Sequence, residues 1–196
     1  MEIIKLTFGN VARGAMARIG RVLVSGGVIA YPLDTVYGLG AIISSKKAIE
    51  KIRYIKGRDY AKPLSILVRD ITMAARYSYI TTEANPYLPG PYTVLVAKKP
   101  LVKDWVSNND LVGIRLPDFW FTKELMHNVV EPIITTSANL SGYPPVYSIR
   151  ELLQQLGDRA KMIDLIVDAG VLLRRPLSKI VDLTNKKIIE WWPSKN

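Results

Sequence analysis

The chain of 196 residues has no cysteine and a single histidine, His127. The absence of cysteine excludes disulfide bonds, thiolate zinc sites and cysteine nucleophiles. A Ser-His-Asp mechanism or a multi-histidine metal site would depend on His127 alone, which lies in a helical pattern and reads as a surface residue. No apolar run is long enough to cross a bilayer, and the first residues show no secretory pattern. We therefore expect a cytoplasmic protein, without membrane contact and without a metal site of its own.

Acidic residues are also scarce, since 27 Lys and Arg face 17 Asp and Glu, for a net charge of +10. Such an excess attracts polyanions, including nucleotides and RNA. The positive charges are scattered along the chain, so a generally basic or thermophilic surface would explain them equally well. The hydrophobic content of 48% is enough for one good core. We expect a single domain spanning residues 1–196.

Strand-like and helix-like patterns alternate at short intervals, with turn residues between them. Helices are predicted at 10–25, 45–55, 70–77, 118–130 and 149–156, with caps at Asn10, Asp70, Asp118 and Ser148, the last in a capping box with Glu151. Strands are predicted at 2–6, 28–31, 64–68, 92–97, 111–116, 133–135, 163–167, 177–183 and 187–191. Two apparent hairpins favour a mixed sheet over a parallel one. The fold class is α/β (α+β).

A polar loop follows the buried strand that ends at Thr135. Thr135, Thr136, Ser137, Asn139 and Ser141 place five hydroxyl or amide side chains within seven residues. A turn needs only one or two such groups for local backbone bonds. Surplus donors at the end of a strand suit an oxyanion or a phosphate. The alternative is an ordinary Ser/Asn-rich loop, and composition alone does not separate the two.

Three cations occur together in a second stretch, KGRDYAKPL. Lys56, Arg58 and Lys62 cannot all pair locally, because Asp59 is the one acid among them. Cations at the end of a helix also complement its dipole. That explanation covers Lys56 well but accounts less easily for Arg58 and Lys62.

Two further stretches join strands to turns. AYPLDTVYGLG is expected to leave a buried strand into a loop in which Gly38 and Gly40 permit close backbone approach to a ligand, with a plain strand–turn–strand as the alternative. YLPGPYTVLVAKK leads from a Pro-Gly-Pro turn into a strand.

On the apolar strand at 111–116, Arg115 is expected to have an anionic partner if it is buried.

The candidate groups are cations and neutral polar side chains: Lys56, Arg58, Lys62, Arg115, Thr35, Thr135, Ser137, Asn139, Ser141 and Ser178. No general-base histidine and no carboxylate pair stands out. This inventory suits charge stabilisation on phosphates better than proton transfer. Because a Walker A loop is absent, any ATP site is of another type.

In this order, the four stretches resemble the YrdC-like family, whose enzymatic members are threonylcarbamoyl-AMP synthases. The resemblance extends from about Val28 to Leu183, and Lys-x-Arg followed by Ser-Ala-Asn is its most specific part. It implies a twisted mixed sheet with flanking helices and a deep, positively charged cavity. The implied reaction converts L-threonine, bicarbonate and ATP into threonylcarbamoyl-AMP and pyrophosphate, with Mg²⁺ carried by the nucleotide. A downstream threonylcarbamoyl transferase complex then modifies tRNA, and contact with tRNA or double-stranded RNA is also implied.

The resemblance also implies residue roles. Lys56 and Arg58 should be catalytic and hold the ATP phosphates and the carbamate. The ATP site would comprise Lys56, Arg58, Lys62, Ser137, Asn139 and Pro145, with Pro145 near the adenosine. The threonine site would comprise Leu33, Thr35, Arg115, Thr135 and Ser178, with Arg115 on the threonine carboxylate.

One departure concerns the amino acid, because the family usually has Thr where this chain has Leu33. The competing hypothesis is a non-catalytic YrdC-like module that binds RNA or a ribosomal partner. Carbamoyl-phosphate handling, as in hydrogenase maturation, is disfavoured because no zinc-finger or acyl-phosphatase segment is found. For the enzyme, the separate segments must converge on one electropositive hollow that takes a triphosphate.

Overall fold

A computed structural model describes residues 1–6, 14–185 and 187–189. Its strands form one sheet in the order β1-β8-β2-β3-β7-β4-β6-β5-β9-β10. The strands are β1 (Glu2–Lys5), β2 (Ile29–Pro32), β3 (Tyr37–Ile42), β4 (Ser65–Leu67), β5 (Tyr92–Ala97), β6 (Leu111–Arg115), β7 (Ile133–Ser137), β8 (Leu165–Asp168), β9 (Lys179–Asp182) and β10 (Lys187–Ile189). The sheet contains parallel pairs such as β4/β6 and β5/β9 and antiparallel pairs such as β3/β7 and β5/β6. The predicted mixed sheet is thus confirmed.

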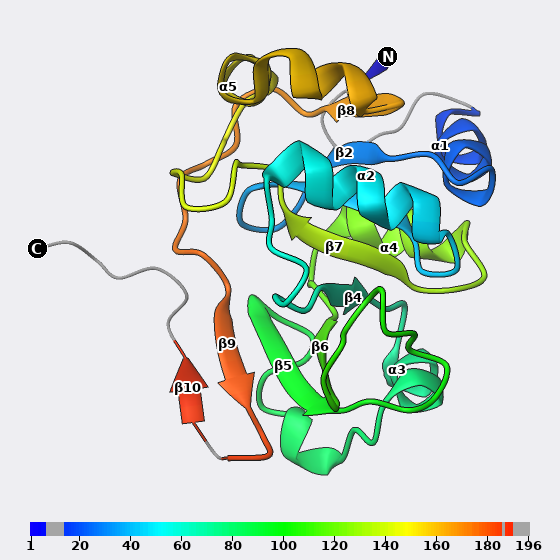
Figure 1. Cartoon of the computed structure of the whole chain (residues 1–196), viewed down its shortest axis with the longest axis vertical. Coiled ribbons are helices and arrows are strands. Elements are labelled where there is room, and N and C mark those ends of the chain that lie inside the picture. The colour runs from blue at the N-terminus through cyan, green and yellow to red at the C-terminus, as the bar shows by residue number, and fades with distance from the viewer. Residues whose placement is uncertain (7–13, 186, 190–196) are drawn as a thin grey trace, which may run out of the picture.

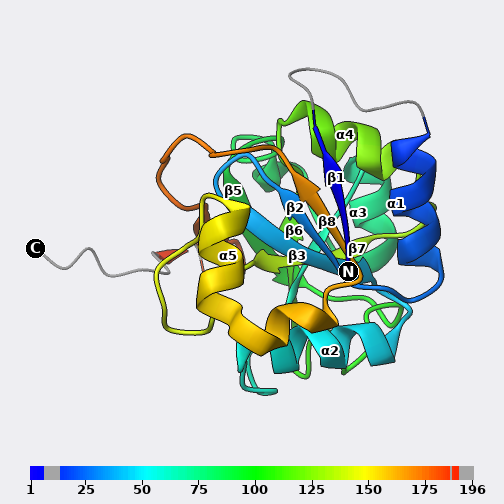
Figure 2. The ribbon, with the colours of Figure 1, turned by 90° about the horizontal axis from the view of Figure 1, so that it is seen from above.

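Five helices and two 3₁₀ turns connect the strands in the described residues. They are α1 (Ala15–Val24), α2 (Lys46–Lys56), α3 (Ile71–Tyr77), α4 (Trp120–His127) and α5 (Ile149–Leu156), with 3₁₀ turns η1 (Thr82–Ala84) and η2 (Gly157–Met162). Seen from above, α2 and α5 lie on one side of the β1–β8–β2–β3 strands, and α1 and α4 lie together on the other (Figure 2). In Figure 1, α2 lies in front of β7 and ends short of β5 and β9. None of the helices in the described ranges has the length and apolar character needed to cross a membrane.

Burial follows the predicted apolar faces. In α2, Ile49, Ile52 and Ile55 are fully buried, as their helical spacing predicts. The helix begins at Ser45, whose Oγ accepts a hydrogen bond from the Ala48 amide. It ends at Gly57, which adopts the left-handed conformation (φ 57°) that glycine reaches without strain. The chain then runs from Gly57 across to β4, and this connection carries Arg58 and Lys62, whereas Lys56 is the last residue of α2.

The Gly38–Gly40 segment differs from the prediction. It belongs to strand β3, which is paired with β2 on one side and β7 on the other, so the plain strand–turn–strand alternative is correct. A Cβ on Gly38 would lie 2.8 Å from Leu33 Cδ1, and one on Gly40 would lie 2.8 Å from Tyr31 Cε1. These glycines therefore make room for neighbouring side chains rather than for a ligand.

Helix starts were predicted unevenly. Asp70 caps α3, with its Oδ1 accepting from the Met73 amide at 2.6 Å. Asp118 was a wrong cap for α4: the N-cap is Phe119, without a side-chain cap bond, and Asp118 instead pairs with Lys123. In α5, Ser148 Oγ accepts from the Glu151 amide, whereas Glu151 accepts from Tyr147, so half of the capping box forms. The predicted cap Asn10 and strand end Trp191 lie outside the described residues.

Candidate active site

A cavity of about 400 Å³ opens over the middle of the sheet. Eight of the eleven residues expected in the ATP and threonine sites line it: Leu33, Thr35, Arg58, Lys62, Arg115, Thr135, Ser137 and Ser178. The further candidate Ser141 does not line it. They come from the turn after β2, the α2–β4 connection, β6, β7 and the segment before β9. The structure thus brings segments up to about 145 positions apart, from Leu33 to Ser178, to one hollow with three cations on its wall.

The floor of the cavity is a row of residues paired across four strands. Thr135 of β7 pairs with Ser65 of β4, Ser65 with Gly113 of β6, and Gly113 with Leu95 of β5. Directly paired residues point to the same face of a sheet. A Cβ on Gly113 would lie 2.5 Å from Ser65 Oγ and 2.9 Å from Thr93 Cγ2. Gly113 is therefore what keeps the floor hollow between two hydroxyl-bearing side chains.

Arg115 and Asp34 form a buried ion pair at the cavity wall. Arg115 Nη2 lies 2.5 Å from Asp34 Oδ1, and their side chains are 4% and 11% exposed. The anionic partner expected for a buried Arg115 is therefore Asp34, from the turn after β2. Arg115 Nε is buried and has no partner among the described residues. The guanidinium lines the cavity, where its remaining donors could meet a carboxylate.

Arg58 and Lys62 provide the other cavity cations. Arg58 Nη2 donates to the Pro63 carbonyl at 2.8 Å, which holds its side chain against its own loop. Burial, together with the nearby Arg53 guanidinium, lowers the pKa of Arg58 to about 10, so it remains charged near neutral pH. Lys62 is exposed at the cavity wall and can move toward a ligand.

A buried tyrosine behind the floor orients Thr135. Tyr31 is fully buried, and its hydroxyl donates to Thr135 Oγ1 at 2.9 Å. Burial raises the pKa of Tyr31 well above its usual range, so the hydroxyl keeps its proton. With its oxygen accepting from Tyr31, Thr135 is left with its own proton to donate into the cavity. Neither Tyr31 nor the floor residues Ser65, Thr93 and Gly113 were among the predicted site residues.

Lys56, Asn139 and Pro145 do not line this cavity. The Lys56 ammonium is 2% exposed and donates to the Ser137 carbonyl and, at 2.7 Å, to the Asn139 carbonyl. The Asn139 amide group donates to the carbonyls of Leu140 and Tyr143, which closes the polar loop on itself. Pro145 borders a separate hollow of about 540 Å³ with Gln155 and Arg174 among its walls.

The buried Lys56 predicts a pH effect on stability. Burial, with repulsion from Arg58 as the second cause, lowers the pKa of Lys56 from 10.5 to about 7. Between these values the unfolded chain binds more protons at this group than the folded protein, so the stability rises with pH above about 7. Below that pH both states are protonated and this group adds no further change. The check is the urea midpoint from about pH 6 to pH 9 in wild type and Lys56→Met, and equal slopes in both would contradict the assignment.

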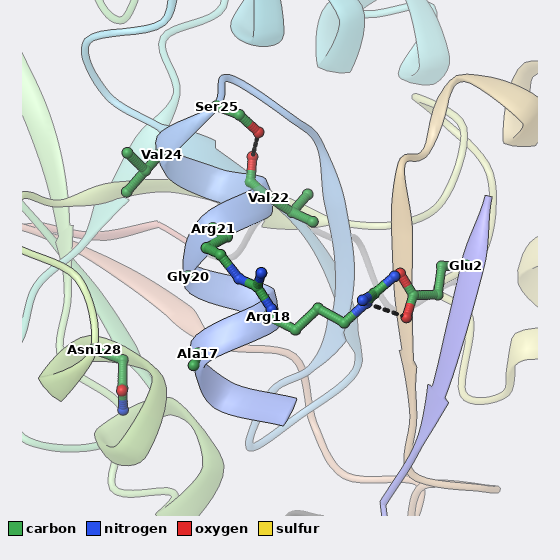
Figure 3. A pocket seen from close by; sticks show the side chains of 9 residues that line it. All are labelled: Glu2, Ala17, Arg18, Gly20, Arg21, Val22, Val24, Ser25 and Asn128. Atoms are coloured by element: carbon green, nitrogen blue, oxygen red, sulfur yellow. Dashed lines mark hydrogen bonds and ion pairs between the residues drawn. The ribbon is translucent and has the colours of Figure 1, made fainter. Parts of the chain in front are cut away.

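A larger hollow of about 790 Å³ lies elsewhere, along α1 (Figure 3). Arg18 reaches across it to Glu2 at 2.5 Å, and Asn128 borders it from the end of α4. None of the predicted site residues lines it. The volume alone therefore does not identify the site, whereas the convergence of cations and hydroxyls does.

The family model named Sua5_yciO_yrdC, described as "Telomere recombination", matches residues 21–190. The chain belongs to this family. A Methanocaldococcus jannaschii relative with the provisional name threonylcarbamoyl-AMP synthase is 34% identical over 171 residues, which cover 85% of this chain and 79% of the relative. A Vibrio campbellii threonylcarbamoyl-AMP synthase is 33% identical over 147 residues, covering 71% and 80%. The crystal structure of P. abyssi Sua5 complexed with L-threonine matches 97% of the present chain, with a TM-score of 0.85 and 26% sequence identity. This chain spans 55% of that Sua5 chain.

Proposed function

We propose that this protein is an L-threonylcarbamoyladenylate synthase, a nucleotidyltransferase that forms threonylcarbamoyl-AMP and pyrophosphate from L-threonine, bicarbonate and ATP. The observation that carries the proposal is the single cavity that joins Arg58, Lys62 and Arg115 to a floor of hydroxyls. The synthase names of relatives at 33–34% identity support the same reaction.

The phosphate half of the site is proposed to lie at Arg58, Lys62 and Ser137. Phosphoryl and nucleotidyl transfer need positioning and countercharge more than covalent help from the protein. In the proposed step, the carbamate oxygen forms a bond to the α-phosphorus while the bond to the β-phosphate oxygen breaks and pyrophosphate leaves. Two cations beside that position would stabilise the charge that builds up on the leaving group.

Mg²⁺ would enter as part of the ATP substrate. Among the described residues, no group of three or more acidic or histidine side chains is placed to hold a metal. The ion would therefore be held through phosphate oxygens and water, in keeping with its reluctance to dehydrate.

The amino-acid half of the site is proposed to lie at Arg115, Thr35, Thr135 and Ser178. Arg115 offers a planar guanidinium to the carboxylate of the amino acid. Thr135 offers a proton oriented by Tyr31. Leu33, only 7% exposed, adds an apolar wall to the cavity. An amino acid with a short, partly apolar side chain such as threonine suits this combination.

The decisive experiment measures pyrophosphate release by the purified protein with ATP, bicarbonate and L-threonine. Release should require all three substrates, and threonylcarbamoyl-AMP should be found by mass spectrometry. Repeating the assay with serine or valine in place of threonine tests how the pocket wall formed by Leu33 selects the amino-acid side chain. If the protein binds ATP but releases no pyrophosphate with any amino acid, the synthase proposal is wrong and a non-catalytic binding module replaces it.

The wider setting follows from the product. A mixed anhydride of AMP must be passed to an acceptor, and we propose a downstream transferase complex acting on tRNA in the cytoplasm. We also propose that residues 1–196 form one domain, since one sheet runs through the described residues from β1 to β10.

A further inference from the structure

The last turn of α2 carries two buried cations whose partners are backbone carbonyls. Arg53 and Lys56, each 2% exposed, are three positions apart and so lie on one face of the helix. They are called here the α2 cation pair. Both stand at the negative end of the helix dipole, which offsets part of the cost of burying a positive charge. Such burial is expensive without good partners.

Arg53 binds the loop between α2 and β4. Its Nη1 donates to the carbonyls of Asp59 and Lys62, each at 3.1 Å, and its Nη2 donates to the Trp105 carbonyl at 3.2 Å. The Arg53 carbonyl accepts from the Arg58 amide at 2.9 Å. The Tyr60 ring covers the guanidinium, with 5.1 Å between its carbon and the ring centre. Arg53 thus holds the segment that carries Arg58 and Lys62 from both ends.

Lys56 binds the loop after β7 in the same way. Its ammonium has three oxygen acceptors, the carbonyls of Ser137 and Asn139 and, at 3.5 Å, Asn139 Oδ1. In its charged form, below pH about 7, the group has three protons, and these acceptors use them. The Lys56 carbonyl also accepts from the Ser141 amide at 2.8 Å. The residue is tied to the loop through its side chain and its backbone, behind the cavity wall.

We infer that the α2 cation pair is a positioning device that sets the spacing between the two cavity loops, 58–63 and 137–143. Arg53 fixes the loop that carries the cavity cations, Lys56 fixes the loop that carries Ser137, and one helical turn joins them rigidly. Lys56 acts through Ser137 and Asn139 rather than by touching phosphate. What the loops bind rests on the proposed function, whereas their attachment to α2 does not.

Hydrogen exchange in the ligand-free protein tests the attachment. Lys56→Met should speed exchange about tenfold or more in peptides from 137–143, and Arg53→Met should do so in 58–63. Peptides from β5 serve as the internal reference. Lys47→Met removes an exposed cation from the same helix and should change neither loop. If Lys56 were only a phosphate ligand, exchange without ligand would stay as in wild type, and that result would overturn the inference.

Steady-state kinetics test what the attachment of the two loops to α2 does for the reaction. Lys56→Met should raise the KM for ATP about tenfold or more and leave the KM for the amino acid within about twofold. The double variant with Ser137→Ala should lose little beyond the larger single effect, because both act on one loop. Full additivity would contradict action through Ser137. If Lys56→Met does not fold, Lys56→Gln and Arg53→Lys take the place of the methionine variants, with smaller shifts in the same loops.

The two proposals fail separately. Faster loop exchange without any pyrophosphate release by the wild type would leave the α2 cation pair standing and remove the synthase function. Normal release with unchanged exchange in both variants would do the reverse.

Discussion

Replacing Arg58 with alanine is expected to lower kcat/KM for pyrophosphate release by about 10²- to 10³-fold, while the fold is retained. The side chain lines the cavity and stays charged near neutral pH despite its lowered pKa. Its hydrogen bond to the Pro63 carbonyl presets its position, so little reorganisation is needed when negative charge builds up on the phosphates. Truncation removes that countercharge and adds no compensating group.

The measurement is steady-state kinetics with a thermal melt on the same samples. Arg76→Ala is the matched control, since Arg76 is an exposed arginine in the last turn of α3 and does not line the cavity. It should keep wild-type kinetics. Arg58→Lys should recover part of the rate, because it restores the charge without the planar guanidinium. A loss of less than about fivefold in Arg58→Ala would remove Arg58 from the proposed chemistry.

Much of the framework was predictable because its signals are local. The strand predicted at 92–97 follows a Pro-Gly-Pro turn, and β5 has these bounds. The apolar spacing in 45–55 gave α2 to within one residue. The Gly38–Gly40 error has a different origin. Glycines there make room for Leu33 and Tyr31, and these contacts depend on how β2, β3 and β7 are paired. No local pattern encodes that pairing.

Most residues of the site were predicted from the sequence, but the role of each residue was not. Lys56, Arg58 and Lys62 stand within seven positions and look alike in the sequence. The structure separates them, because Lys56 is buried on two loop carbonyls while Arg58 and Lys62 line the cavity. The supporting contacts span long distances: 104 positions for Tyr31 and Thr135, and 81 for Asp34 and Arg115. Burial and register decide these roles, and both arise only when the sheet is assembled.

Replacing Arg115 with methionine is expected to destabilise the protein by about 3 kcal/mol and to abolish amino-acid-dependent pyrophosphate release. The stability loss comes from Asp34, whose side chain is only 11% exposed in the wild type and whose carboxylate would lose its partner at 2.5 Å. The activity loss comes from the missing carboxylate receptor at the cavity wall. Urea denaturation and the release assay measure the two effects on the same preparation.

A second substitution separates these effects. In the double variant Asp34→Leu/Arg115→Met no charge is left behind, so most of the lost stability should return, because a well-packed apolar pair often replaces a buried ion pair at little cost. The amino-acid-dependent release should stay absent, because the receptor for the carboxylate is still missing. If release returned together with stability, Arg115 would serve the fold alone and the carboxylate would have to bind another cation of the cavity. The expected result, with stability recovered and activity still lost, would mean that Arg115 has two partners at once. Asp34 holds the guanidinium in place, and the remaining donors of Arg115 bind the substrate.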